Sequence, residues 1–364
     1  MKRIGSIVIM ILLLCAAVAT GVQAAERPVV DVVFCLDTTG SMGGLIEGAK
    51  VKIWSIANQI VTGTPTPKLR IGLVAYRDRG DDYITRIYPL GDDLDRVYEN
   101  LMSFYADGGG DTPEHVNRAL HDALHRIKWS EEADLKIIFL VGDAPPHMDY
   151  RDGYDWRAIC REAVLMDVII NTVQCGNAPE TEQVWQKIAR AAEGSYARVP
   201  QSGGMSSVRT PLDDDLAELG VRLEETVVAY GDSESISDMK ERTGKVKKMA
   251  APAAAERAAY RSKDMGAGTH DLVDAVRFGT VKLEEIEEQE LPEEMHAMST
   301  EEREQYLWQK ERERELLRMK IEKLSKQRNE YILSLLKKTQ GTDSFDEAVK
   351  SIIRKQAAEK GIDY

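Results

Sequence analysis

The sequence has 364 residues and a hydrophobic fraction of 43%, which is enough chain for two domains and a substantial core. Its 61 acidic residues outnumber its 48 Lys and Arg residues, which gives a formal net charge of −13. A surface this acidic repels phosphate backbones and anionic lipid headgroups, so we exclude nucleic-acid binding and membrane-surface binding.

The first residues have the pattern of a secretory signal. Lys2 and Arg3 precede an apolar run over residues 7–18, and Val22-Gln23-Ala24 fits the small-x-small rule of signal peptidase. We therefore expect residues 1–24 to be a signal peptide and the protein to be exported, to the periplasm or otherwise to the medium. The alternative is an uncleaved membrane anchor, for which the apolar run is short.

The next stretch predicts a buried strand followed by a polar turn. Residues 29–36 form an almost unbroken apolar run, typical of a central strand in a parallel sheet, and Asp37-Thr38-Thr39-Gly40-Ser41 follows directly. Residues 45–61 then have the apolar spacing of a helix. Such a turn lies at the carboxyl edge of the sheet, where open α/β folds bind ligands. Asp37, Thr39 and Ser41 offer hard oxygen ligands of the kind that Mg²⁺, Mn²⁺ or Ca²⁺ prefers.

Further strands and helices alternate along the chain. We expect a hairpin of strands at 68–76 and 83–90, and then strands at 135–141, 168–173 and 195–199. The predicted helices cover residues 94–104, 112–127, 156–166, 181–192 and 213–230. This alternation predicts a doubly wound α/β fold whose mostly parallel sheet has one antiparallel edge strand, followed by a helical C-terminal region.

Two further loops carry candidate ligands. A glycine-rich loop over residues 107–114 contains Thr112, which we expect to be the N-cap of the next helix, with Pro113 as the first helical residue. The strand at 135–141 is followed by Asp143. The glycine-rich loop lacks the Gly-Lys-Ser/Thr ending that cradles phosphates, so the sequence gives no nucleotide-binding signature.

The cysteines allow one disulfide hypothesis. Cys15 lies in the signal, and Cys35 lies inside the first strand, where a thiol is usually inert. Cys160 and Cys175 are predicted to reach the same end of the sheet. An oxidising compartment would permit a disulfide between them.

The C-terminal part differs in composition. Residues 231–265 are rich in Ser, Ala, Gly, Pro and Lys, as in a linker or loose helix, and residues 266–364 form a highly charged helical region. A helix predicted from 300 to about 338 has an apolar seam that fits a coiled coil or a helical hairpin, and thus a homo-oligomer. The alternative is one long helix lying against the α/β domain. The seam residues are Leu317, Ile321, Leu324, Tyr331 and Leu335.

The three polar loops together resemble a known family. The turn from Asp37 to Ser41, the Gly-Gly-x-Thr loop ending at Thr112 and the later Asp143 are similar to the von Willebrand factor A (VWA) domain and its metal ion-dependent adhesion site. The resemblance covers roughly residues 28–230, so we expect a VWA domain over 26–230. The loops at 75–81 and 141–150 also resemble a subgroup found in bacterial exported proteins.

The resemblance implies a role for each site residue. The hydroxyls of Thr39 and Ser41 would bind Mg²⁺, or Mn²⁺ or Ca²⁺, directly, while Asp37 and Asp143 would act largely through water and Thr112 would join in some states. The remaining coordination position would receive an Asp or Glu carboxylate from a partner protein. The physical logic is that acids held behind water leave the cation incompletely neutralised, so it attracts the incoming carboxylate.

The leading interpretation is an exported, cation-dependent protein-binding module. A second possibility is a structural or assembly protein that works through its charged helical tail. An enzyme is a third, but the sequence has no catalytic motif: His121 and His125 lack the Glu and the third ligand of a zinc site. His147, near Asp143, remains a candidate base or a group behind the metal.

Overall fold

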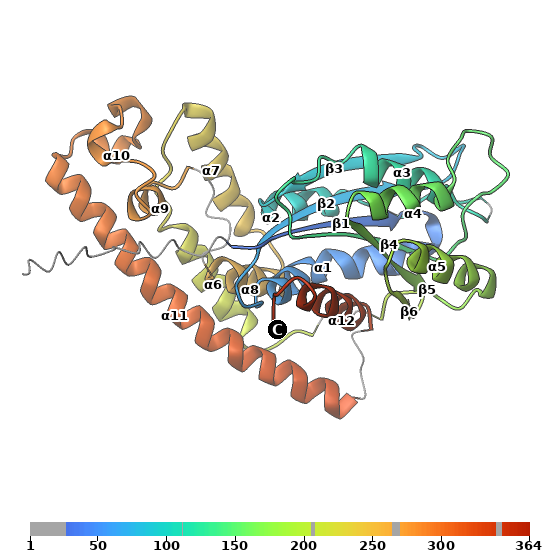
Figure 1. Ribbon diagram of the computed structural model, residues 1–364. Helices are drawn as coiled ribbons and strands as arrows, with labels where there is room; N and C mark the ends of the chain where they lie inside the picture. The colour runs from blue at the N-terminus through green and yellow to red at the C-terminus, as the bar shows by residue number, and fades with distance from the viewer. Residues whose placement is uncertain (1–26, 111, 205–207, 264–269, 340–343) are drawn as a thin grey trace, which may run out of the picture.

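The computed structural model describes residues 27–110, 112–204, 208–263, 270–339 and 344–364. A six-stranded sheet with the order β3-β2-β1-β4-β5-β6 forms its centre (Figure 1). All neighbouring strands are parallel except β3, which runs antiparallel to β2. This confirms the predicted doubly wound α/β fold with one antiparallel edge strand. The strands are β1 (Val29–Asp37), β2 (Lys68–Tyr76), β3 (Thr85–Gly91), β4 (Leu135–Gly142), β5 (Val168–Cys175) and β6 (Tyr196–Val199).

Strand β1 is buried because it lies between β2 and β4, with helices over both faces. Every residue from Val30 to Asp37 is buried, as the nearly continuous apolar sequence of the strand predicts. The strand therefore delivers Asp37 to the carboxyl edge from the middle of the sheet.

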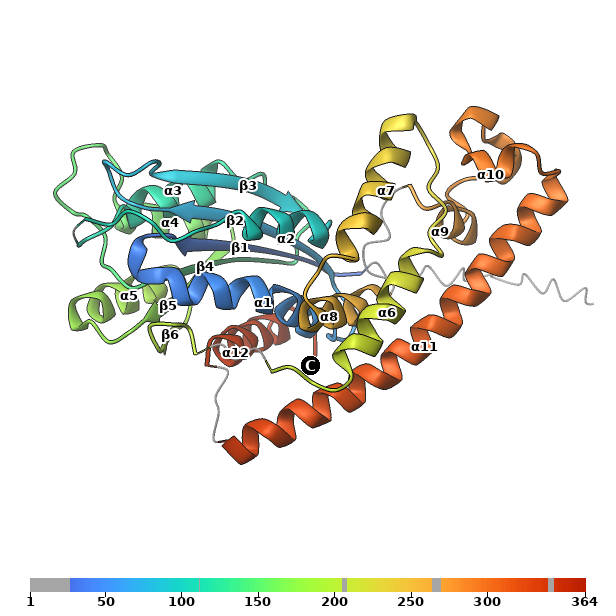
Figure 2. The same ribbon diagram turned by 180° about the vertical axis from the view of Figure 1, so that it is seen from behind.

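Helices cover both faces of this sheet (Figures 1 and 2). One face packs against α1 (Gly43–Ile60), α2 (Leu94–Met102) and α12 (Ser344–Ala358), which share a single apolar core with the strands. The opposite face packs against α3 (Val116–His125), α4 (Trp156–Leu165) and α5 (Pro179–Ala191). The last helix of the chain is thus part of the α/β layer, although it lies far beyond the expected boundary at residue 230.

Helix α12 is fixed to the sheet by polar contacts as well as apolar ones. The buried amides of Asn171 on β5 and Gln356 on α12 donate to one another, at 3.0 and 2.8 Å. After the helix, Asp363 pairs with Thr64 in an isolated bridge, and the Tyr364 hydroxyl donates to the carbonyl of Ile60 at 2.9 Å. The C-terminus therefore ends against the same layer in which the chain began.

The chain between β6 and α12 is mainly helical. Residues 231–265 were expected to be a linker or loose helix. They contain α7 and α8, and α8 packs against α1 and α6. The helices here are α6 (Asp213–Glu224), α7 (Ser233–Val246), α8 (Ala251–Arg261), α9 (Leu272–Arg277), α10 (Glu293–His296) and α11 (Thr300–Thr339). Short 3₁₀ turns are η1 (Gly40–Met42), η2 (Leu283–Glu285) and η3 (Glu288–Glu290).

Helix α11 is one continuous helix of 40 residues that runs along the outside of the molecule (Figures 1 and 2). It packs against α6, α8 and α9. In the predicted seam, Leu317 and Ile321 are buried and Leu324 is half-buried, all in contact with α6 and α8 of the same chain. This arrangement matches the alternative of one long helix, and the described residues leave side chains on the opposite side of α11 exposed.

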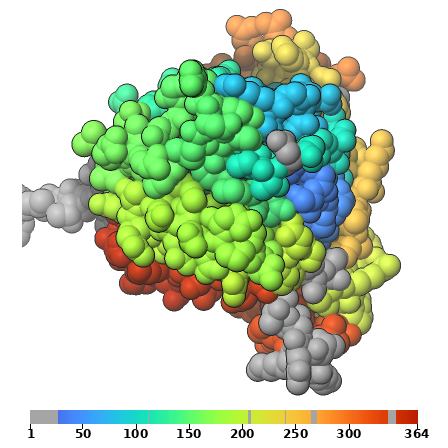
Figure 3. All heavy atoms as spheres, turned by 90° about the vertical axis from the view of Figure 1, so that its right-hand side faces the viewer, coloured from blue at the N-terminus to red at the C-terminus, as the bar shows by residue number. Residues whose placement is uncertain are grey.

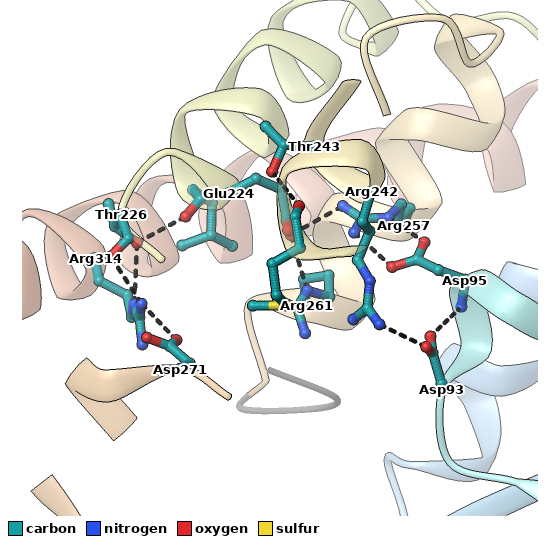
Figure 4. A network of polar contacts seen from close by, with 12 residues as sticks. Asp93, Asp95, Glu224, Thr226, Arg242, Thr243, Arg257, Arg261, Asp271 and Arg314 are labelled. Atoms are coloured by element: carbon teal, nitrogen blue, oxygen red, sulfur yellow. Dashed lines mark hydrogen bonds and ion pairs between the residues drawn. The ribbon is translucent and has the colours of Figure 1, made fainter. Parts of the chain in front are cut away.

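Buried ion pairs join the helical region to the α/β layer (Figure 4). Arg257 on α8 binds Asp95 on α2 through two contacts, at 2.6 and 2.7 Å, and also donates to Glu224 on α6 at 3.0 Å. Arg261 donates to the same Glu224 oxygen at 2.9 Å. Arg242 on α7 donates to Asp93, the N-cap of α2, at 2.6 Å. The helical region is therefore attached to the layer by charge as well as by packing.

The cysteines correct one prediction. Cys160 and Cys175 are free thiols, buried in the cores on opposite faces of the sheet, so the proposed disulfide between them is wrong. Alternation of side chains along β5 turns Cys175 away from α4, which carries Cys160.

The structure leaves the predicted signal peptide untested, because residues 1–26 lie outside the described part of the chain. Within the described residues, we find no helix with both the length and the apolar character needed to cross a bilayer.

Candidate functional site

The predicted ligands gather at the carboxyl edge of the sheet. Figure 3 views this side of the molecule, where the segments after β1 (blue), β2 (light blue), β4 (green) and β6 (yellow-green) meet. Because β1, β2 and β4 are parallel neighbours, the turns that follow them necessarily share this edge. Asp37, Thr39, Ser41 and Asp143 belong to those turns.

Asp37 organises the first turn. Its Oδ1 accepts hydrogen bonds from the backbone N–H of Thr39 at 2.9 Å and from the Thr39 hydroxyl at 2.7 Å. The Thr39 and Ser41 hydroxyl oxygens lie 3.4 Å apart. Asp37 and Thr39 are buried, whereas Ser41 is exposed. One carboxylate and two hydroxyls thus form a compact oxygen cluster that opens toward solvent at Ser41.

The second oxygen of Asp37 has an unusual environment. Asp37 Oδ2 is inaccessible to solvent and makes no well-formed hydrogen bond with another described residue. Burial and, next, the charge of Asp143 raise the pKa of Asp37 to about 7, against opposing hydrogen bonds from Thr39 and the Asp143 backbone. A buried carboxylate oxygen without a donor is costly, so it requires a partner such as a proton, water or cation.

Asp143 lies close to this turn because Gly142 has no side chain. A Cβ at Gly142 would lie 2.9 Å from Asp37 Cβ and 3.0 Å from Asp37 Oδ2, and would also overlap the Tyr76 hydroxyl. Asp143 is half-buried, and its Oδ2 accepts a hydrogen bond from Gln201 Nε2 at 2.6 Å. The same amide nitrogen lies 3.3 Å from the Ser41 carbonyl. Gln201 therefore connects the turns after β1 and β4, and no feature of the sequence pointed to it.

The glycine-rich loop packs against the Asp37 turn. Gly40 N–H donates to the Gly108 carbonyl at 3.2 Å, and a Cβ at Gly109 would lie 2.9 Å from Thr39 Cβ. Gly108 and Gly109 have φ angles of +76° and +74°, a conformation that favours glycine. Thr112 follows on this loop with an exposed side chain, and it makes no hydrogen bond with the other four predicted ligands within the described structure.

The predicted helix start at Thr112 is wrong. Helix α3 begins at Val116, and His115 occupies the N-cap position. The intervening Glu114 is held by the chain after β4 instead: its N–H donates to the Pro145 carbonyl at 3.0 Å, and His147 N–H donates to its carbonyl at 3.1 Å. Tertiary pairing thus replaces the first helical turn that Pro113 indicated.

Three acids near the site were missed by the sequence reasoning. Burial, followed by the charge of Asp37 and then Asp78, raises the pKa of Glu114 to about 9, so this side chain is protonated at neutral pH. Asp81 accepts hydrogen bonds from Gly109 N–H at 3.2 and 3.3 Å. Asp78 is buried. For Asp78 and Asp81 the sequence did offer a signal. They belong to the turn after β2, which must lie at the same edge of the sheet as the turn after β1.

A histidine and tyrosine cluster borders these acids. Tyr150 donates to Asp78 Oδ2 at 2.6 Å and stacks on the His147 ring at a centroid distance of 4.1 Å. His147 Nδ1 is 2.8 Å from Asp149 Oδ1, and His115 Nε2 is 2.9 Å from Asp152 Oδ2. These contacts place His147 beside Asp78 rather than in contact with Asp143. His121 and His125 instead contact Asp122 and Glu162, respectively.

The residues at the Asp37 turn fit a divalent cation. They provide hydroxyl oxygens from Thr39 and Ser41 and two carboxylates, one of which has an unpartnered buried oxygen. Burial and then repulsion from Asp143 raise the pKa of Asp37, and a cation would offset both effects. The set contains no His or Cys, the ligands that Zn²⁺ and Cu²⁺ prefer, and the described residues contain no cluster of three or more His, Cys, Asp or Glu groups arranged to hold a metal.

Comparison with known proteins identifies the α/β segment. A family model described as the von Willebrand factor A domain matches residues 31–207. Human von Willebrand factor A domain-containing protein 7 is 34% identical over 119 residues, which is 33% of this chain and 12% of that protein. An ariadne-like RING finger protein of Acanthamoeba polyphaga mimivirus is 28% identical over 161 residues, 40% of this chain and 16% of that protein. The chain therefore spans only a small part of these relatives.

Solved structures with a similar arrangement are more distant. The SpRpn10 VWA domain has 15% identity and a TM-score of 0.36, and the match covers 53% of this chain and 95% of that one. Proximal thread matrix protein 1 from the mussel byssus has 14% identity and a TM-score of 0.38, over 48% of this chain and 42% of that one.

Proposed function

Residues 31–207 of this chain form a von Willebrand factor A domain, generally a protein-interaction module, and from that premise we propose an exported protein that binds its partner through a divalent cation. The cation is Mg²⁺, or Mn²⁺ or Ca²⁺ in its place. Thr39 and Ser41 hold it through their hydroxyls, Asp37 and Asp143 hold it largely through water, and Thr112 joins them in some states. When bound, the cation supplies a positive centre that attracts an Asp or Glu carboxylate of the partner.

The observation that carries this proposal is the buried, unpartnered Oδ2 of Asp37. The other oxygen of this carboxylate accepts from the Thr39 hydroxyl, and the charge of Asp143 acts on Asp37, so the described residues around it supply negative charge and oxygen atoms and no cation that lowers its pKa. A divalent cation satisfies these groups at once. The exposed Ser41 lies on the solvent side of the cluster, which is where a partner would approach.

The surface near the site suits a protein partner. Tyr105, half exposed, lies against the guanidinium of Arg77, and Met148 is similarly exposed on the loop after β4. Arg77 Nε in turn donates to the Thr38 carbonyl in the metal-binding turn. Aromatic and methionine side chains are enriched where proteins associate, so this rim supports capture of a protein rather than of a free carboxylate.

Cation binding can be measured directly by isothermal titration calorimetry with Mg²⁺ on the full exported chain. We expect Asp37→Ala and Ser41→Ala each to lower the affinity for Mg²⁺ at least about tenfold, because each removes a group from the oxygen cluster. Asp92→Ala is the matched control. Asp92 follows β3 at the opposite edge of the sheet and is largely exposed.

Partner capture is tested separately, by affinity capture from the exported fraction with Mg²⁺ and again with a chelator. Proteins retained only with Mg²⁺, and lost with Ser41→Ala, support the proposal. Unchanged Mg²⁺ binding in both site variants would refute the metal assignment. Capture that persists with chelator would instead favour the alternative, a structural or assembly protein acting through its charged helical tail.

Export to the periplasm, and membership of the bacterial exported subgroup, are part of the proposal. They rest on the N-terminal sequence pattern over residues 1–24. N-terminal sequencing of the mature protein from cell fractions tests both: a mature chain that begins after Ala24 supports them, and a cytoplasmic chain that begins at Met1 contradicts them.

A further inference from the structure

The long helix α11 has apolar side chains on two opposite sides. Leu307, Leu317 and Ile321 are buried against the rest of the chain. On the other side, Trp308, Leu316 and Met319 remain 54%, 52% and 52% exposed. Single exposed apolar residues are ordinary, but three large ones that close together on one side of a helix require an explanation.

These three side chains form one continuous stripe. Positions 308, 316 and 319, together with 312, are separated by steps of four, four and three residues, so they lie on the same side of a helix. Arg312 lies over the Trp308 ring, 5.1 Å from its centre, and thus extends the stripe between the apolar residues. The stripe (Trp308, Arg312, Leu316 and Met319) points away from α6, α8 and α9, which cover the buried side.

The charges of α11 differ between its two halves. Residues 300–319 contain six Glu and five Arg or Lys, whereas residues 320–339 contain two Glu and six Arg or Lys. Arg314 and Arg318 are buried against the chain itself, so the first half presents mainly acidic groups to solvent. Lys320 and Lys323 in the second half are exposed.

We propose that a second copy of this chain binds the stripe, with the two α11 helices antiparallel and crossing midway along it, near positions 313 and 314, so that Trp308 of each copy lies beside Met319 of the other. This pairing sets the acidic start of each helix beside the basic middle of the other, with Glu304 beside Lys323 and Arg312 beside Glu315. Parallel pairing would align like charges along both halves. A chain of net charge −13 repels its own copies elsewhere, so the basic half of α11 is the favourable place for self-association.

The overall arrangement permits this pairing. The α/β layer and α6, α8 and α9 all lie on the buried side of α11, so the stripe is accessible along the helix (Figures 1 and 2). In the antiparallel dimer the two α/β layers lie on opposite sides of the helix pair and cannot collide. The pairing uses a different side of α11 from the predicted seam, because the chain itself covers Leu317 and Ile321 of that seam and partly covers Leu324.

Cysteine cross-linking separates the two orientations. In the antiparallel pair, position 308 of one helix lies beside position 319 of the other, so the double variant Trp308→Cys/Met319→Cys forms a disulfide between copies under mild oxidation. The two positions 330 then lie about 50 Å apart along the helix axis, so Glu330→Cys does not cross-link. In a parallel pair both variants cross-link. The unmodified chain is the background control, since its Cys35, Cys160 and Cys175 are buried.

Association itself is measured by sedimentation equilibrium of the full chain from about 1 to 100 μM. We expect a dimer, and Leu316→Glu and Met319→Glu should each raise its dissociation constant about tenfold or more. Leu165→Glu is the control, because Leu165 is 86% exposed on α4, outside α11. A monomer at every concentration, an unchanged constant in both α11 variants, or cross-linking of Glu330→Cys would overturn the proposal. Each variant should still bind Mg²⁺, so this result is independent of the metal site.

Discussion

Glu224 provides the sharpest test of how the helical region is attached. Its carboxylate is 4% exposed, and one oxygen accepts hydrogen bonds from Arg257 at 3.0 Å and from Arg261 at 2.9 Å. Burial alone would raise the pKa of Glu224, but the charges of Arg261 and Arg257 outweigh it and hold the pKa well below its ordinary value of 4.5. The carboxylate is therefore charged at neutral pH and balances two buried guanidinium groups (Figure 4).

Glu224→Gln keeps the size of the side chain and removes its charge. Removing one partner of a buried ion pair lowers the unfolding free energy by about 3–5 kcal/mol. We expect the lower end, about 3 kcal/mol, because the amide oxygen still accepts a hydrogen bond and Arg257 retains its ion pair with Asp95. The corresponding fall in melting temperature is about 4 °C for a chain of 364 residues. Differential scanning calorimetry of the full chain measures it.

The neighbouring Glu225→Gln is the matched control. Glu225 is half exposed and pairs with Lys247 at 3.2 Å, so its loss should cost less than about 1 kcal/mol. The pH dependence gives a second check. Because the folded state lowers the pKa of Glu224, its contribution is complete above pH 4.5 and declines as the pH falls below that value. Equal stability of the two variants at pH 7 would refute the reasoning.

Two other substitutions test the α/β layer. Gly142→Ala should displace Asp37 and lower the affinity for Mg²⁺ in calorimetry, because the new Cβ would lie 2.9 Å from Asp37 Cβ. Gly110→Ala is the control, because its Cβ would enter open space on the same edge of the sheet. Equal losses of affinity in the two variants would contradict the packing argument. Gln356→Leu should lower the unfolding free energy by about 1–3 kcal/mol in urea titrations, because it leaves the buried amide nitrogen of Asn171 without its acceptor. An unchanged midpoint would mean that α12 does not contribute to the stability of the layer.

The sequence was sufficient to predict the sheet and the edge at which its polar turns meet. The apolar runs that became β1 and β4 are long and buried on both faces, and a polar turn that follows a parallel strand has only one edge to occupy. Asp37, Thr39 and Ser41 are close in sequence, so local geometry alone brings them together. Asp143 needed only the pairing of β1 with β4.

Residues brought in by tertiary contacts were not predictable in this way. Gln201 reaches Asp143 from a loop 58 positions later in the chain, and Glu114 is fixed by backbone pairing with the residues after β4. Neither contact leaves a periodic signal. The disulfide between Cys160 and Cys175 failed for a related reason, since spacing along the chain did not reveal on which face of the sheet each thiol lies.

The position of α12 was missed because its sequence resembles that of any amphipathic helix. Phe345, Val349 and Ile353 are buried against α1 and the sheet, but nothing in their spacing identifies that surface. From composition, we predicted that the α/β domain ends at residue 230. In the structure, α12 packs against the sheet and so belongs to the α/β layer.

The packing of α12 against the sheet determines when the α/β layer can be completed. Ser55 on α1 and Asp346 on α12 are hydrogen-bonded across 291 positions, so the sheet lacks part of its apolar cover until the end of the chain has been made. During synthesis, the strands emerge from the ribosome before α12 has been made. Final closure of the α/β layer must therefore wait until α12 has emerged, and a chain that lacks α12 would expose the same apolar surface permanently.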